Sequence, residues 1–134
     1  MVFPTKIGGD LELYSLKSAE GLVLLLTQIG GSLSLKDLQS ADGLVLPTKI
    51  GRDLDLRSLE SAEGLRLPNE IGRDLYLNGL LSAKGLVFPT KIGRDLHLWN
   101  LLSAEELRLP NEIGGMLCIS DLLKKILRDN NYKF

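Results

Sequence analysis

The sequence repeats one motif of 21 residues about six times. Residues 43–63 (GLVLPTKIGRDLDLRSLESAE), 64–84 (GLRLPNEIGRDLYLNGLLSAK) and 85–105 (GLVFPTKIGRDLHLWNLLSAE) align without a gap. Less regular copies occupy residues 1–20, 21–42 and 106–119, and the copy at 21–42 contains one additional residue. A unit this short cannot bury its own apolar face, so the repeat indicates a solenoid whose coils stack on one another.

The apolar residues of each copy predict two short strands. In the copy at 64–84, Leu65 and Leu67 are two positions apart, as are Leu75 and Leu77. This is the spacing of a strand, in which side chains alternate between two faces. We therefore expect one strand at LRL and another at DLYL. Pro68 is expected to end the first strand, because it has no N–H group for a further ladder hydrogen bond.

Two turns connect the predicted strands. The turn PNEIGRD contains Gly72, and a glycine fixed at this place in every coil indicates a positive φ or a close approach of two backbones. The segment LLSAKG is expected to form a single helical turn closed by Gly85, with Leu80 and Ala83 pointing inward. The residues equivalent to Gly72 are Gly8, Gly30, Gly51, Gly93 and Gly114.

Strands one coil apart can pair only in parallel, which stacks equivalent residues about 4.8 Å apart. Lys49, Glu70, Lys91 and Glu112 then form a column of alternating charge that favours a single register. Connections between parallel strands are right-handed in nearly all proteins. We therefore predict an all-β fold: a right-handed parallel β-solenoid of about six coils of 21 residues, with two short strands per coil.

The end of the sequence predicts a cap. We assign residues 1–119 to the repeat solenoid and residues 120–134 to a C-terminal capping helix and tail. Ser120 is the expected N-cap, with Asp121 in the first turn. A helix lying on a membrane surface is the less favoured alternative, because the segment is short and its charge is mixed. The apolar face of the helix is expected to contain Leu122, Leu123, Ile126 and Leu127.

The beginning of the sequence predicts no cap. The chain starts in mid-coil at MVFP, and an exposed first coil offers free strand edges for pairing. We therefore expect that two chains can form a homodimer through their N-terminal coils.

Composition limits the classes of partner and the compartment. The formal net charge is −1, which argues against a basic surface for nucleic acid. Cys118 is the only cysteine, which excludes an internal disulfide and favours a reducing, cytoplasmic location. No signal peptide is recognisable, and the apolar run at residues 22–26 is too short to span a bilayer. We expect no membrane partner.

The segments IGGDLEL, IGRDLYL and IGRDLHL, each followed by a leucine-containing turn, resemble leucine-rich repeats and receptor L domains. The resemblance covers residues 1 to about 119 and implies a solenoid of parallel strands that acts as a recognition or scaffold module. The chain lacks the disulfides of extracellular L domains and the stacked asparagine of ordinary leucine-rich repeats. Roles of individual residues therefore do not transfer from those families.

The positions that vary between coils are the candidates for function. The outward position of the DLxL strand and the position two residues later contain the only Trp, the only His and two of the three Tyr. Exposed aromatic residues favour interfaces, whereas a surface position without constraint also varies between copies, and both interpretations remain open here. The predicted binding face consists of Tyr14, Arg57, Tyr76, Asn78, His97 and Trp99.

An enzyme is the competing functional class. Asp53, Asp74 and Asp95 recur in successive coils, which is typical of turn chemistry rather than of a unique catalytic constellation. His97 and Cys118 fall in adjacent coils, but no third orienting group and no pocket are expected in a filled solenoid. We predict no catalytic residue, no metal site and no cofactor. The predicted function is protein recognition or scaffolding without catalysis, and the alternative is a structural or self-assembling solenoid.

Overall fold

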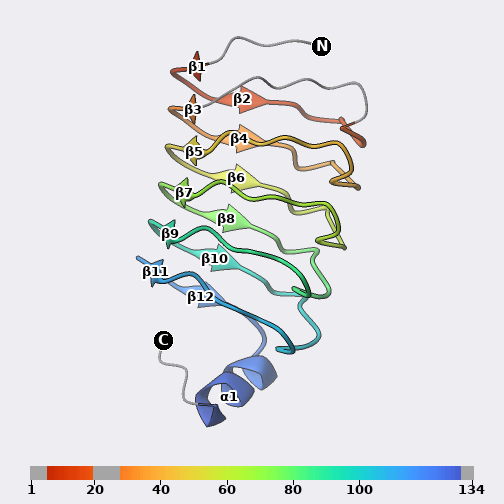
Figure 1. The fold of residues 1–134 in the computed structure, drawn as a ribbon, viewed down its shortest axis with the longest axis vertical. Coiled ribbons are helices and arrows are strands. Elements are labelled where there is room, and N and C mark those ends of the chain that lie inside the picture. Colours follow the sequence, from red (N-terminus) through yellow and green to blue (C-terminus); the bar gives the residue numbers. More distant parts are fainter. Residues whose placement is uncertain (1–5, 20–27, 131–134) are drawn as a thin grey trace.

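The chain forms a parallel β-solenoid with two strands in each coil, as the repeat predicted (Figure 1). The computed structural model describes residues 6–19 and 28–130. One six-stranded sheet, the β1–β11 sheet, contains β1 (Lys6–Ile7), β3 (Gln28–Ile29), β5 (Lys49–Ile50), β7 (Glu70–Ile71), β9 (Lys91–Ile92) and β11 (Glu112–Ile113). The other, the β2–β12 sheet, contains β2 (Leu11–Glu12), β4 (Leu33–Ser34), β6 (Leu54–Asp55), β8 (Leu75–Tyr76), β10 (Leu96–His97) and β12 (Leu117–Cys118).

The register of both sheets follows the repeat. Leu54 pairs with Leu75, and Lys49 pairs with Glu70. The ion pair between Lys49 and Glu70 spans 3.8 Å and that between Lys91 and Glu112 spans 3.9 Å, so opposite charges do stack on the surface of the β1–β11 sheet. The additional residue of the second copy falls within residues 20–27, outside the described part of the chain, and pairing on either side of it stays in register.

The space between the two sheets is filled by columns of leucine and isoleucine. Each column contributes one side chain per coil, and in the middle coils at most 1% of each side chain is exposed. The corner near Leu80 and Ala83 is also closed, because these two side chains are 0% and 1% exposed. The fully buried columns include Ile29, Ile50 and Ile92; Leu33, Leu54, Leu75 and Leu96; and Leu35, Leu56, Leu77 and Leu98.

The first strand of each coil lies later than the sequence predicted. The fourth coil (residues 64–84) has no strand at LRL, and β7 begins two residues after Pro68. The N–H group of Leu65 closes a turn by donating to the carbonyl of Ala62, and Pro68 has no N–H group. Asn69 is the first residue after the proline that donates to the preceding coil, through a bond to Thr48. Pro68 therefore precedes the strand instead of ending it.

The corner between the coils is a pair of turns, so the prediction of a helical turn was wrong. The N–H group of Leu80 donates to the carbonyl of Leu77, and that of Leu86 donates to Ala83. The glycine of this corner has a positive φ, +76° at Gly85. In the next coil Glu106 occupies the same position with φ of 58°, so a residue other than glycine can adopt this conformation.

The glycine column in the middle turn has a different cause. Gly72 does not have a positive φ, but a Cβ atom built on it would overlap the carbonyl group of Gly51 in the preceding coil. The same overlap would occur at Gly51 and Gly93. Of the two explanations that the sequence allowed, close backbone approach is therefore the correct one.

Helix α1 (Asp121–Asp129) follows the last strand and lies at the end of the stack (Figure 1). Ser120 is its N-cap, as predicted, and its hydroxyl accepts a hydrogen bond from the N–H group of Leu123 at 3.3 Å. Only part of the predicted apolar face is buried. Leu123 and Leu127 join the core, whereas Leu122 and Ile126 are 67% and 38% exposed. No helix in the described ranges is both long and apolar enough to cross a bilayer.

Candidate functional site

The variable positions project from the outer face of the β2–β12 sheet. Along this sheet Asp55 pairs with Tyr76, Tyr76 with His97, and His97 with Cys118. Parallel pairing in register therefore brings together side chains that are about 21 residues apart in sequence. Three of the predicted binding residues, Arg57, Tyr76 and His97, meet in one cluster through this pairing.

Two stacked rings form the centre of this cluster. The rings of Tyr76 and His97 lie 4.5 Å apart between centroids and are nearly parallel, at 7°. Both reach the same carboxylate oxygen, Oδ2 of Asp74: the Tyr76 hydroxyl donates to it at 3.1 Å, and His97 Nε2 lies 3.3 Å from it. The side chains of His97 and Asp74 are each only 16% exposed. The rings are therefore held against one fixed, partly buried acceptor.

Arg57 extends the cluster into the preceding coil. Its guanidinium group binds both carboxylate oxygens of Asp55, with the shortest contact 2.6 Å from Nη2 to Oδ2. It also lies 5.5 Å from the centre of the Tyr76 ring, a distance at which the positive charge is attracted to the ring face. Asp55 is 9% exposed, so this pair is shielded on the carboxylate side. The cluster, defined as Asp55, Arg57, Asp74, Tyr76 and His97, thus spans the third to fifth coils.

The charges in the cluster are set by its hydrogen bonds. Burial acts to raise the pKa of Asp74, but hydrogen bonds from the backbone of Asp95, from His97 and from Tyr76 outweigh it, and the net pKa is lowered. Burial, and then the bond to Asp74, raise the pKa of the Tyr76 hydroxyl. At neutral pH Asp74 is therefore an ionised acceptor and Tyr76 a neutral donor.

The remaining predicted residues lie outside the cluster. Tyr14 is 49% exposed and lies under the ammonium group of Lys36, 4.4 Å from the ring centre, in the first two coils. Trp99 is 49% exposed, two residues after His97. The Oδ1 atom of Asn78 is buried and has no hydrogen-bond partner among the described residues. The face therefore has a rigid centre with exposed aromatic residues on either side.

Cys118 continues the column but is not part of the cluster. It is 6% exposed, and burial, followed by the charge of Asp95, raises the pKa of its thiol. A raised pKa disfavours the thiolate form that a nucleophile or metal ligand needs. The pairing of His97 with Cys118 in adjacent strands is confirmed, but the Cys118 side chain is buried and does not contribute to the exposed face.

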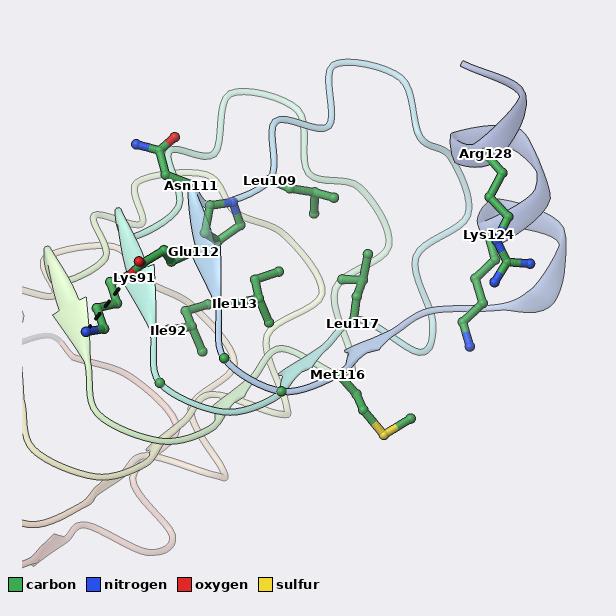
Figure 2. Close-up of a pocket in the computed structure, with 14 residues that line it drawn as sticks. Lys91, Ile92, Leu109, Asn111, Glu112, Ile113, Met116, Leu117, Lys124 and Arg128 are labelled. Atoms are coloured by element: carbon green, nitrogen blue, oxygen red, sulfur yellow. Dashed lines mark ion pairs between the residues drawn. The ribbon is translucent and has the colours of Figure 1, made fainter. Parts of the chain in front are cut away.

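A hollow of about 860 Å³ lies elsewhere, lined by residues of the last two coils and of α1. Figure 2 shows Ile92, Ile113 and Leu117 along it, and Lys124 and Arg128 of α1 at its edge. None of the residues of the cluster lines it. The cluster on the β2–β12 sheet is therefore a surface array that lies apart from this hollow.

The recurring aspartates link successive coils, a role that turn chemistry did not predict. Oδ1 of Asp74 accepts a hydrogen bond from the backbone N–H of Asp95 in the next coil, at 3.1 Å. Asp53 bonds in the same way to Asp74, at 2.9 Å, and Asp95 bonds to Met116, at 2.7 Å. The signal was the period itself, since an acidic side chain repeated every 21 residues stacks beside the next copy.

One group of side chains has the composition of a metal site. Asp74, Asp95 and His97 each offer a ligand atom, and these atoms all lie within 4.8 Å of one another.

Comparison with known proteins finds no match: no family model, no curated protein and no solved structure matches this chain.

Proposed function

We propose that this chain is a non-catalytic recognition or scaffold module that binds a protein partner through the outer face of the β2–β12 sheet. The observation that carries the proposal is the cluster around Asp74, in which Tyr76 and His97 are stacked 4.5 Å apart and share one acceptor. A surface that varies without constraint has no reason to join its side chains across three successive coils.

Preorganisation supports a binding role. Ordering rotamer-rich side chains at an interface costs about 0.5–1.5 kcal/mol each, and this cost is avoided when they are already held in the free protein. Arg57, Tyr76 and His97 are held in this way, and exposed Trp99 follows His97 by two residues. Tyrosine, tryptophan and arginine are also the residues that most often dominate binding energy at protein interfaces.

The likeness of the repeat to leucine-rich repeats and receptor L domains is a further argument, by analogy, for recognition over catalysis. Solenoids of that kind use one strand face for binding. We also propose a reducing, cytoplasmic setting, because a buried lone cysteine is compatible with it.

The proposal is tested by photo-crosslinking. A photoreactive amino acid is placed at Trp99 in one variant and at Val87, which is 79% exposed outside the cluster, in a matched control. Both proteins are exposed to lysate of the source cell. We expect a discrete crosslinked protein from position 99 and none from position 87.

A second variant tests the chemistry of the face. Tyr76→Ser/His97→Ser/Trp99→Ser should lose the captured protein, whereas Val45→Ser/Val87→Ser, which removes exposed apolar groups outside the cluster, should keep it. Circular dichroism must first show that both variants fold as the wild type does. Equal retention by the two variants would contradict the proposal.

Self-assembly is the second candidate, because the first coil is less buried than the others. Ile7, Leu11, Leu13 and Leu16 are only partly buried, whereas their equivalents one coil later, Ile29, Leu33, Leu35 and Leu38, have no exposed surface. β1 and β2 also form the edges of their sheets. The prediction of an uncapped start concerned residues 1–5. These residues lie outside the described part of the chain. A mass that increases with concentration in light scattering would favour this function.

A further inference from the structure

The strongest unassigned feature of the face is the spacing of the Asp74, Asp95 and His97 ligand atoms. Two ligands bound about 2.0–2.1 Å from a tetrahedral Zn²⁺ are about 3.3 Å apart. Asp74 Oδ2 and His97 Nε2 are 3.3 Å apart. The third ligand atom, from Asp95, lies within 4.8 Å of both, so closure of the site needs a movement of at most about 1.5 Å.

The two carboxylates are already oriented for such a site. Each uses Oδ1 to accept a backbone hydrogen bond from the next coil, Asp74 from Asp95 and Asp95 from Met116. Oδ2 of Asp74 faces His97, 3.3 Å from Nε2. Hydrogen bonds that hold ligating carboxylates in place are a general feature of metal sites.

The imidazole is oriented as well. Parallel stacking on Tyr76 fixes the plane of the His97 ring, and Nε2 points at Asp74. A metal ion would take the place of the proton on Nε2, and the ring would keep its proton on Nδ1. The Tyr76 hydroxyl, which donates to Asp74 Oδ2, would remain as a supporting contact.

The other coils act as an internal control. The equivalent triplet one coil earlier is Asp53, Asp74 and Tyr76, and one coil later it is Asp95, Met116 and Cys118. Neither combines two carboxylates with an imidazole, since the earlier triplet ends in a tyrosine and the later one contains a methionine and a buried cysteine. Among the described residues, only the step between the fourth and fifth coils combines two carboxylates with an imidazole at this spacing.

We propose that Asp74, Asp95 and His97 form a binding site for one divalent transition-metal ion on the outer face of the β2–β12 sheet. Two carboxylate oxygens and one imidazole nitrogen suit Zn²⁺, Co²⁺ or Mn²⁺ better than Ca²⁺ or Mg²⁺, which take oxygen ligands. Three protein ligands leave a coordination position open to water. The site does not depend on the proposed recognition role.

The test is titration of untagged, chelator-treated protein with Co²⁺, followed by displacement with Zn²⁺. His97 is the only histidine, so without a tag every imidazole signal comes from this residue. We expect one ion per chain, visible d–d absorption of Co²⁺, and a change in the nitrogen shift of Nε2 when Zn²⁺ binds. Asp95→Asn and His97→Gln should each weaken binding by more than about 100-fold, because loss of supporting contacts alone costs 10–100-fold.

Asp53→Asn is the matched control. It removes one charge from the same column and keeps an oxygen to accept the Asp74 N–H, but Asp53 is not among the proposed ligands. We expect its affinity to stay within about three-fold of the wild type. Tyr76→Phe keeps the stacked ring and loses the hydroxyl, and should weaken binding about ten-fold.

Three results would overturn the proposal. The first is no Co²⁺ or Zn²⁺ binding by the wild type at millimolar metal. The second is binding that His97→Gln leaves unchanged, which would identify an adventitious ion only. The third is equal weakening by Asp53→Asn and Asp95→Asn, which would show a general effect of charge. Circular dichroism of the metal-free proteins separates loss of the site from loss of the fold.

Discussion

A methyl group added at Gly72 should test whether the solenoid depends on close contact between successive backbones. In Gly72→Ala the new Cβ would overlap the carbonyl of Gly51, and backbone cannot move aside as a flexible side chain can. Gly8 is the matched control, because it occupies the same position in the first coil and nothing lies within 4 Å of the Cβ that alanine would add there.

The cost can be estimated from the contacts next to Gly72. Its own N–H donates to Ile50 at 2.9 Å, and the N–H of Arg73 donates to Arg52 at 3.0 Å. Moving the two coils apart would weaken both bonds, each contributing about 0.5–1.5 kcal/mol, and overpacking adds about 1–3 kcal/mol. We expect the free energy of unfolding to fall by about 2–6 kcal/mol, a large share of the 5–15 kcal/mol that is typical of a domain.

Urea unfolding provides the measurement. Circular dichroism reports the strands and Trp99, the only tryptophan, reports the fifth coil, so coincident curves would justify a two-state analysis. Gly8→Ala should stay within about 1 kcal/mol of the wild type, because alanine in an open position also lowers the entropy of the unfolded chain. Equal midpoints for the two variants would refute the argument from backbone approach.

Three further predictions follow from single contacts. The lowered pKa of Asp74 means that its ionised form stabilises the fold above about pH 4, the range of the unfolded carboxyl, and that this contribution is lost as the pH falls through the folded pKa. In urea unfolding without metal, the free energy of unfolding of the wild type should therefore exceed that of Asp74→Asn by more at pH 7 than at pH 3. A difference that stays the same at both pH values would contradict this. Ser120→Ala removes the hydrogen bond from the Leu123 N–H to the N-cap and should destabilise α1 by about 1 kcal/mol. The loss should appear as faster hydrogen exchange in the first turn of α1, and unchanged exchange would contradict the role of this cap. Burial and the raised pKa of Cys118 should make the native thiol react with a disulfide reagent far more slowly than the unfolded thiol, and equal rates would exclude this burial.

The period and the apolar pattern were sufficient to predict the architecture. Parallel pairing in register, the DLxL strand, the alternating Lys49–Glu70 ladder and the Ser120 cap were all read from the sequence and are confirmed. Each depends on residues that are neighbours in a coil or one period apart, and such relations are visible in a repeat.

The first strand and the corner were predicted wrongly because their structure depends on which backbone groups are free. Leu65 has strand spacing, but its N–H group is used in a turn, and Pro68 has none to offer. Periodicity reports the burial of side chains and does not report the partner of each N–H group. For this reason β7 could be found only in the folded chain.

The 21-residue period is enough to show that this protein is a stack of coils and to identify the side chains that share one outward column. The stacking of Tyr76 on His97, their shared contact with Asp74 and the burial of Cys118 are visible only in the folded chain. This difference arises because a repeat specifies the position of each residue to within one coil. Rotamers, hydrogen-bond partners and burial are settled by contacts between coils, where each neighbour is a different residue.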